Sequence, residues 1–262
     1  MLNEVIPLIL RAGKLIAAEA ARPGGPRGEE DKADIDLEVE TLLREGLLRL
    51  QEGDFWGEET GSALTGARYC WVVDPNDGTS DFLAGRTGSA ISVGLLRDSE
   101  PVLGVVYAST SPCGPDCISW ESGMTGLLRN GILISPDLAV RQLDAGTVVF
   151  VSTAANQKPE LNAELCSPAG FSAMPSIAYR LARVAAGDGI AGVSLYPVSP
   201  HDVVAGHALL KAAGGDLLDQ DGHPIRYDDL SKPLCRSCFG GNLAASQCLA
   251  ARPWQQRLSI PS

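Results

Sequence analysis

The chain has 262 residues, of which 45% are hydrophobic and 20% charged, a composition typical of a folded globular protein rather than a disordered or fibrous one. Its 32 acidic and 21 basic residues leave a formal charge of −11, which argues against a protein that binds nucleic-acid backbones or anionic membranes. A chain this acidic needs metal ions to hold a phosphate compound.

The first twenty residues predict an amphipathic helix. Apolar residues such as Val5, Ile9 and Ile16 recur at helical spacing, and Arg11 and Lys14 interrupt the apolar run. These charges argue against a signal peptide, and no apolar run in the sequence approaches the length of a membrane span. We therefore expect a cytoplasmic protein.

Further along, strands and helices are predicted in mixture. An acidic run at 29–36 leads into a second helix with apolar residues from Leu37 to Leu48. Apolar runs that end at turn residues predict strands at 69–73, 90–96 and 102–108, and glycine stops end predicted helices at 175–186 and 203–213. This order favours an α+β or layered αβ architecture. We expect a single domain over 1–262, with halves of about 1–140 and 141–262 that meet near residues 135–147.

Seven cysteines have no spacing that indicates a disulfide framework, so we expect buried or free thiols. A zinc site is the alternative for two pairs, Cys113 with Cys117 and Cys235 with Cys238. The pairs lie far apart in the sequence, and no histidine pair is spaced to complete either one.

The most informative stretch is 71–81. A predicted strand ends at Asp74, and Asp77 follows three residues later. Two carboxylates at this spacing in a turn can converge on one divalent cation, and the carbonyl of Asn76 can point the same way. Hard cations such as Mg²⁺ prefer oxygen ligands of this kind. The alternative is a surface turn with solvated acids.

The residues after this turn predict a phosphate cradle. The backbone N–H groups of Gly78, Thr79 and Ser80 open a predicted helix, and a helix N-terminus binds anions. Glycine at 78 allows close approach of a ligand to the backbone.

Three further acidic points stand out. Glu58 and Glu59 lie in the run 56–60, and the alternative for them is an exposed charged loop. Asp202 precedes a helical run, where it is a candidate N-cap. Asp36 lies at the start of the second predicted helix.

Taken in order, three of these motifs resemble the inositol monophosphatase superfamily. They are Gly57-Glu-Glu59, Asp74-Pro-Asn-Asp-Gly-Thr79 and Asp202-Val-Val-Ala-Gly206. The resemblance extends over about 31–241 and implies a Mg²⁺-dependent, lithium-sensitive phosphatase. It also implies an α+β fold, the layered αβαβα sandwich of the inositol monophosphatase and fructose-1,6-bisphosphatase type. Members of this family are often homodimers.

The resemblance assigns roles to the metal-binding positions, with two or three Mg²⁺ ions at the site. Glu58 resembles a ligand shared between metals that also acts in catalysis, and Asp74 resembles the bridging carboxylate. The carbonyl of Asn76 stands where the family supplies a backbone ligand. Asp77 and Asp202 resemble the ligands of a second metal.

Catalytic and substrate-binding positions follow from the same comparison. Thr79 resembles the threonine that orients the attacking water, and Asp36 resembles the carboxylate that pairs with it. Glu59 matches a supporting residue or a ligand of a third metal. The N–H groups of Gly78 and Thr79 would hold phosphate oxygens. The implied reaction is hydrolysis by attack of a metal-activated water, without a phosphorylated enzyme.

Three positions depart from the family pattern. His201 replaces a tryptophan before the last ligand, either as a packing change or as a changed leaving-group pocket. Ala33 replaces a threonine. Leu195 stands where inositol-specific members carry a glutamate that contacts inositol hydroxyls, which puts inositol phosphate in doubt as the main substrate.

The run 176–187 is more similar to the branch that acts on 3′(2′),5′-bisphosphate nucleotides. That branch often has a basic residue near Arg180, whose guanidinium can bind a second phosphate in a fork. The alternative places Arg180 on a solvated helix face. Tyr179 and Tyr196 are candidates to flank a base, or else belong to the core.

The favoured function is hydrolysis of a small phosphorylated metabolite, with a bisphosphate nucleotide such as 3′-phosphoadenosine 5′-phosphate as substrate and Asp202 among the substrate contacts. Inositol monophosphate, a sugar phosphate or a pathway-specific phosphate are the alternatives. A second class is a catalytically weak sensor of a phosphorylated ligand. His201, Ala33 and the unusual loop at 111–117 motivate that alternative.

Overall fold

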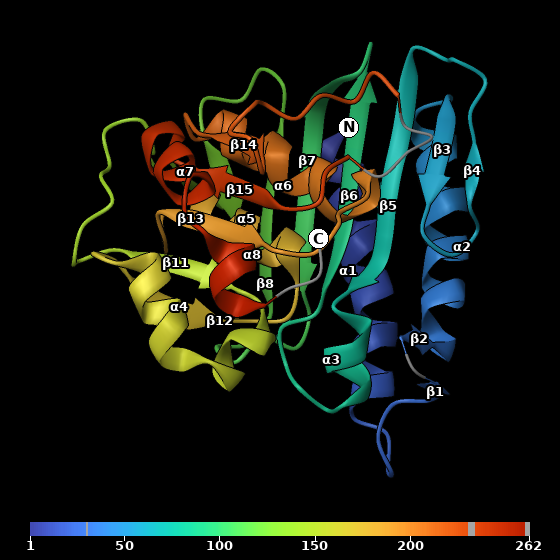
Figure 1. Cartoon of the computed structure of the whole chain (residues 1–262). Helices are drawn as coiled ribbons and strands as arrows, with labels where there is room; N and C mark the ends of the chain where they lie inside the picture. The colour runs from blue at the N-terminus through green and yellow to red at the C-terminus, as the bar shows by residue number, and fades with distance from the viewer. Residues whose placement is uncertain (30, 230–233, 260–262) are drawn as a thin grey trace.

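A computed structural model describes residues 1–29, 31–229 and 234–259 (Figure 1). Within them the larger sheet has the strand order β10-β9-β8-β7-β6-β5-β3-β4, and the smaller has the order β12-β11-β13-β15-β14. The strands of the larger sheet are β3 (Asp54–Gly57), β4 (Ser62–Ala63), β5 (Tyr69–Asp77), β6 (Ala90–Arg97), β7 (Glu100–Ala108), β8 (Asp116–Glu121), β9 (Leu127–Arg129) and β10 (Ile132–Ile134). Those of the smaller are β11 (Val148–Val151), β12 (Gly170–Ala173), β13 (Ala191–Ser194), β14 (Asp216–Asp219) and β15 (Cys238–Gly241).

The helices form layers around these sheets. A short hairpin of β1 (Gly28–Glu29) and β2 (Lys32–Ala33) separates the first two helices. The helices are α1 (Leu2–Ala20), α2 (Asp34–Leu50), α3 (Thr79–Leu83), η1 (Thr153–Gln157, a 3₁₀ helix), α4 (Pro159–Cys166), α5 (Ile177–Ala185), α6 (Pro200–Ala212), α7 (Leu243–Ala250) and α8 (Trp254–Leu258).

Three apolar clusters hold the layers together. The first joins α1 and α2 to one face of the larger sheet, through residues such as Ile9 and Leu43. The second packs α5 and α6 between the two sheets, and the third joins the far face of the smaller sheet to α4, α7 and α8. The order helix, sheet, helix, sheet, helix confirms the predicted αβαβα sandwich.

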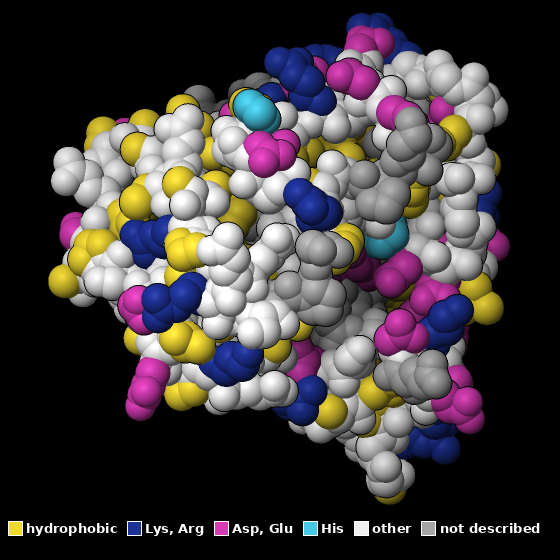
Figure 2. Space-filling model, in the orientation of Figure 1, with side chains coloured by type: hydrophobic (Ala, Val, Ile, Leu, Met, Phe, Trp, Pro, Cys, Tyr) yellow, Lys and Arg dark blue, Asp and Glu magenta, His cyan; other side chains and the backbone are white. Residues whose placement is uncertain are grey.

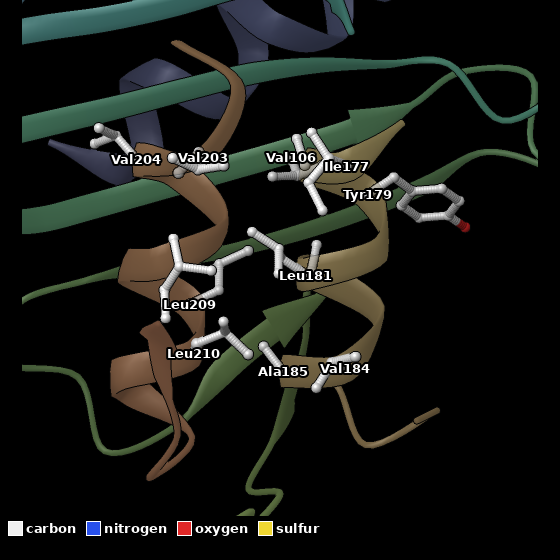
Figure 3. Close-up of a cluster of buried hydrophobic side chains, with 14 of the residues drawn as sticks. Val106, Ile177, Tyr179, Leu181, Val184, Ala185, Val203, Val204, Leu209 and Leu210 are labelled. Atoms are coloured by element: carbon white, nitrogen blue, oxygen red, sulfur yellow. The ribbon is translucent and has the colours of Figure 1, made fainter. Parts of the chain in front are cut away.

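The central helix pair is packed without gaps. Leu181 and Ala185 of α5 point toward Leu209 and Leu210 of α6 (Figure 3). Gly206 of α6 lets the two helices approach, because a Cβ at this position would collide with the Leu181 side chain. The close pairing places the N-terminal ends of α5 and α6 next to the carboxyl end of β5, where the candidate site lies.

The predicted elements are present, with shifted boundaries. The strand expected at 69–73 continues to Asp77, so the acidic turn is part of the strand's buried end. The helix expected from 203 begins at Pro200. The prediction that Asp202 is the N-cap is therefore wrong: Asp202 is the third residue of the helix, and Ser199 is the N-cap. The Asp202 carboxylate accepts a hydrogen bond from the backbone N–H of Ser199.

The cysteines are buried or free thiols, as predicted. Cys113 and Cys248 are exposed and the other five are buried, all as free thiols. In the described part of the chain, no group of three converging metal-ligand side chains contains a cysteine, so the zinc alternative is not supported. No helix in the described ranges is long and apolar enough to cross a bilayer.

Candidate active site

A cleft of ≈ 530 Å³ opens between the two halves of the sandwich. Figure 2 shows it as a hollow bordered by acidic side chains. Its walls come from the end of β5, the start of α3, the segment after β11, and the N-terminal ends of α5 and α6. Of the predicted site residues it is lined by Glu58, Asp74, Asp77, Gly78, Thr79, Ser80, Arg180 and Asp202.

Three predicted metal ligands converge in this cleft. Carboxylate oxygens of Asp74, Asp77 and Asp202 lie within 4.8 Å of one another, although Asp202 is 125 residues from Asp77 in the sequence (202 − 77). Glu58 joins them from the loop after β3, with its carboxyl group hydrogen-bonded to that of Asp74. The structure thus brings together the four predicted carboxylate ligands.

Asp77 is held from the opposite half of the molecule. Its Oδ2 accepts hydrogen bonds from the Ser176 hydroxyl and from the backbone N–H of Ala178, 2.6 Å away, both at the N-terminus of α5. The positive end of a helix dipole favours a carboxylate there. The buried Arg180 guanidinium adds positive charge on the same side, so Asp77 is oriented before any ligand arrives.

The carboxylates repel one another. Burial, followed by the charges of its acidic neighbours, raises the pKa of Asp74 well above the ordinary value, and burial together with Asp77 does the same for the pKa of Asp202. Burial in the cleft wall raises the pKa of Glu58 to about 7. A divalent cation removes this penalty, because it neutralises like charges held in a poorly solvated site. An all-oxygen donor set of this kind fits Mg²⁺.

Next to the cluster lies the predicted Asp36 and Thr79 pair. Thr79 Oγ1 is 3.2 Å from Asp36 Oδ2 and 2.9 Å from the Asn76 carbonyl oxygen. The Asn76 side-chain amide donates to Asp36 Oδ1 at 3.1 Å, and the backbone N–H of Ala33 donates to Oδ2 at 3.3 Å. Burial raises the pKa of Asp36 to about 7, against the effect of these donors. The geometry therefore supports the predicted pairing.

The loop that carries Glu58 and Glu59 is held by hydrogen bonds to Glu40 of α2. This fully buried carboxylate accepts the backbone N–H groups of Glu59 at 2.9 Å and Thr60 at 2.6 Å. Gly57 permits the approach, because a Cβ there would collide with the Glu40 carboxylate. Burial, followed by the charge of Glu40, raises the pKa of Glu59.

The His201 side chain stays neutral beside Asp202. Its Nε2 lies 3.6 Å from Asp202 Oδ1, and burial lowers the pKa of the imidazole to about 4. Its Nδ1 is buried and has no hydrogen-bond partner in the described part of the chain.

Gly78 supports the predicted phosphate cradle only in part. Its φ of +96° lies in the region that glycine adopts most easily, and a Cβ would press on Pro175 at 3.1 Å. The helix that it caps, α3, has only five residues. Phosphate binding by the N–H groups of Gly78, Thr79 and Ser80 remains a prediction.

Arg180, Tyr179 and Tyr196 have different surroundings in the structure. Arg180 is 4% exposed, so the solvated-face alternative is wrong; its guanidinium donates to the backbone carbonyls of Pro175, Ser176 and Val193. Tyr179 belongs to the core and donates from its hydroxyl to Asp116, so it does not flank a ligand. Tyr196 is 51% exposed and lines the cleft.

Several residues that line or support the cleft were missed by sequence reasoning. Ser176 has a local signal, since serine before an apolar helical run is a common N-cap, but its second bond to Asp77 has none. Thr153 has no signal at all: its hydroxyl donates to Asp81 of α3 and ties the two walls of the cleft together. Asp31 and Ser152 also line the cleft.

Comparison with known proteins agrees with this geometry. Residues 2–257 match the inositol monophosphatase family. An inositol-1-monophosphatase of Rhizobium meliloti is 30% identical over 239 residues, which are 85% of this chain and 86% of that protein. The 3′(2′),5′-bisphosphate nucleotidase CysQ of Escherichia coli O157:H7 is 27% identical over 243 residues, covering 87% and 94%. A solved inositol monophosphatase of Thermotoga maritima superposes with a TM-score of 0.76 at 20% identity, covering 98% of each chain.

Proposed function

The chain belongs to the inositol monophosphatase family and is a Mg-dependent phosphoric monoester hydrolase, and within that class we propose that its preferred substrate is a 3′(2′),5′-bisphosphate nucleotide such as 3′-phosphoadenosine 5′-phosphate. The observation that carries the activity is the convergence of Asp74, Asp77 and Asp202 within 4.8 Å in the cleft. Two or three Mg²⁺ ions would be held by these residues with Glu58 and the Asn76 carbonyl, and they supply an activated water and neutralise charge on the phosphate.

The protein's own groups position the water. When the Thr79 hydroxyl donates to Asp36, its oxygen is left free to accept a hydrogen bond from a water in the cleft. Asp36 is in turn held by the Asn76 amide, so the pair has one geometry before substrate binds. Such positioning speeds the reaction when it holds the attacking water in line with the phosphorus atom.

The nucleotide preference is supported by the residues beyond the acidic cluster. Leu195 offers no hydrogen bonds to a polyhydroxylated ring, and the half-exposed ring of Tyr196 lies at the mouth of the cleft. Base rings stack on aromatic side chains of this type. The family relative CysQ is named for this substrate class.

A second candidate is inositol monophosphate. The observation that favours it is the similarity to proteins named inositol-1-monophosphatase, since the one from Rhizobium meliloti is 30% identical to this chain and CysQ is 27% identical. Under this alternative the leaving group is a small polar ring, and the apolar surface of Leu195 contributes nothing to binding.

The second phosphate of the nucleotide is assigned to Arg180. A guanidinium has five N–H donors, of which three are used here for carbonyls, and Arg180 lines the cleft. The buried position gives this charge more effect than an exposed arginine would have.

Phosphate release in Mg²⁺ tests the proposal. The panel is 3′-phosphoadenosine 5′-phosphate, inositol 1-phosphate, fructose 1,6-bisphosphate and histidinol phosphate, with Asp77→Asn as the inactive control. We expect the nucleotide to have the highest kcat/KM and Li⁺ to inhibit turnover. A higher kcat/KM for inositol 1-phosphate would reject the nucleotide proposal, and ligand binding without turnover of any compound would indicate the sensor.

A further inference from the structure

A second pocket of ≈ 170 Å³ adjoins the metal cleft. The two share Ser152, Ala154 and Tyr196, so the pocket lies directly beside the place where a phosphate would bind. Their combined volume falls in the range of roughly 300–1,000 Å³ that is usual for small-molecule sites. The acidic residues belong to the cleft, and no aspartate or glutamate lines the pocket.

The pocket lies where the smaller sheet changes its winding direction. β11 is parallel to both β12 and β13, and the chain leaves β11 through α4 to reach β12 on one side, then returns through α5 to β13 on the other. The helices α4 and α5 therefore cover opposite faces. At such a point the carboxyl ends of neighbouring strands diverge and leave a crevice, which open α/β sheets use for ligands.

The lining combines apolar strand ends with polar side chains, among them Gln157, Lys158 and Asn162. Val151 ends β11, while Val193 and Leu195 come from the end of β13, so flat apolar surface faces the space from both strands. Asn162 of α4 is 2% exposed and also lines the pocket. Its amide nitrogen donates to the carbonyls of Lys158 at 2.9 Å and Ala155 at 3.4 Å.

The Asn162 amide oxygen is therefore the atom left to face a ligand. Within the described ranges no donor bonds to this oxygen. A ligand N–H group that reaches this oxygen gains a hydrogen bond. The oxygen only accepts, so it selects a donor and rejects a carbonyl at the same place.

From this arrangement we infer that the pocket between the ends of β11 and β13 binds the base of the nucleotide substrate, and that the Asn162 amide oxygen accepts a hydrogen bond from an exocyclic amino group on that base. The inference rests on the proposed nucleotide function and adds a base preference to it. The apolar walls contact the ring faces, and Tyr196 at the shared boundary covers the sugar side.

The first test fills the pocket. Ala155 lines it but not the cleft, and Ala155→Leu projects a larger apolar group into the space. We expect KM for 3′-phosphoadenosine 5′-phosphate to rise about tenfold, while KM for glycerol 2-phosphate, whose leaving group is too short to enter the pocket, changes less than twofold. Gln255→Leu, in a separate surface hollow that shares no lining residue with the pocket, serves as the control. Equal changes for both substrates, or no change for the nucleotide, would overturn the assignment.

The second test probes the amino group without changing the protein. It compares 3′-phosphoadenosine 5′-phosphate with the corresponding inosine 3′,5′-bisphosphate. The adenine ring carries an exocyclic amino group where the hypoxanthine ring carries an oxo group. We expect wild-type kcat/KM to favour adenosine about tenfold, and Asn162→Ser to remove most of that preference. Equal wild-type values would overturn the role of Asn162 even if the variant fails to fold. Turnover of glycerol 2-phosphate and inositol 1-phosphate without turnover of either nucleotide would instead reject the proposed function itself.

Discussion

The metal cleft and the neighbouring pocket share three residues but differ in chemistry. The cleft gathers carboxylates that are unfavourable together until a cation arrives, whereas the pocket has no aspartate or glutamate and combines apolar strand ends with polar groups such as Lys158 and Asn162. The cleft serves the phosphate, which every substrate of the class has in common. The pocket meets the leaving group, which differs from one substrate to another. Reaction type and substrate choice are thus separable in this molecule.

The largest expected effect comes from the cleft. Asp77→Asn removes a charge on which the cluster depends, and we expect kcat to fall by at least ~10²-fold for every substrate alike. Asp221→Asn, in the exposed group of Asp219, Asp221 and His223, is the matched control and should keep full activity. Steady-state kinetics check both variants. An active Asp77→Asn enzyme would disprove the metal assignment.

The next effect concerns the water-positioning pair. Thr79→Val keeps the shape of the side chain but removes the hydroxyl between Asp36 and the Asn76 carbonyl, so kcat should fall by about 10²-fold with little change in KM. Thr41→Val on the exposed surface of α2 controls for the substitution itself. A rise in KM without loss of kcat would place Thr79 in binding rather than in catalysis.

Arg180 lines the cleft and also supports the fold, so its substitution should show a mixed effect. Arg180→Lys keeps the charge but cannot serve three carbonyls in a fork, so we expect a loss of ~2 kcal/mol in the free energy of unfolding. KM for bisphosphates should rise about tenfold and KM for monophosphates less than twofold. Denaturant titration and kinetics separate the two effects. Equal rises in KM would show that the residue only supports the fold.

The raised carboxyl pKa values predict how metal binding depends on pH. Asp36 and Glu58 titrate near 7 when folded, above their ordinary values near 4, so the folded metal-free protein binds these protons more tightly than the unfolded chain. The free energy of unfolding of the metal-free protein therefore falls as the pH rises from about 4 to about 7. Mg²⁺ replaces the protons, so its stabilising effect should be larger at pH 8 than at pH 5, by ~5 °C or more in Tm. Thermal melts with Mg²⁺ and with a chelator measure the difference, and a shift that is independent of pH would contradict it.

The smallest effect belongs to the pocket. Leu195→Glu places a carboxylate among apolar strand ends, so KM for nucleotides should rise about fivefold while kcat for glycerol 2-phosphate is unchanged. Leu195→Met, which keeps the apolar character, should behave like the wild type. Kinetic assays with both substrates decide this. A general loss of activity in Leu195→Glu would mean that the pocket and the cleft are not independent.

Much of the cleft was predictable because its signals are local. Asp74 and Asp77 lie three residues apart at the end of an apolar run, and the chemistry of two carboxylates beside a glycine is apparent without a fold. The layered sandwich was predicted through the family resemblance rather than from periodicity. The alternation of elements alone indicated only a mixed architecture.

Errors arose where a long-range contact decides the environment. Arg180 has the sequence context of an exposed helix residue, yet the packing of α5 against β13 encloses it among carbonyls. For Tyr179 the sequence left a ligand contact and a core position open, and its hydrogen bond to Asp116 of β8 decides for the core. Asp202 is predicted as the N-cap because the sequence does not show whether Ser199 or Asp202 is the last residue before the helix. The structure starts the helix at Pro200, directly after Ser199.

By itself, the sequence indicated the carboxylates that can hold a divalent cation and the helical and strand segments, because residue type and short spacing are enough for these. The class of reaction followed from the resemblance of three ordered motifs to a known family. Only the tertiary structure decided that Asp202 meets Asp74 and Asp77, that the α5 N-terminus holds Asp77, and that a pocket with Asn162 opens beside the cleft. These depend on the order of strands in the smaller sheet and on how closely α5 and α6 pack. Such distances between remote segments follow from the packing of the whole chain, and no local pattern encodes them.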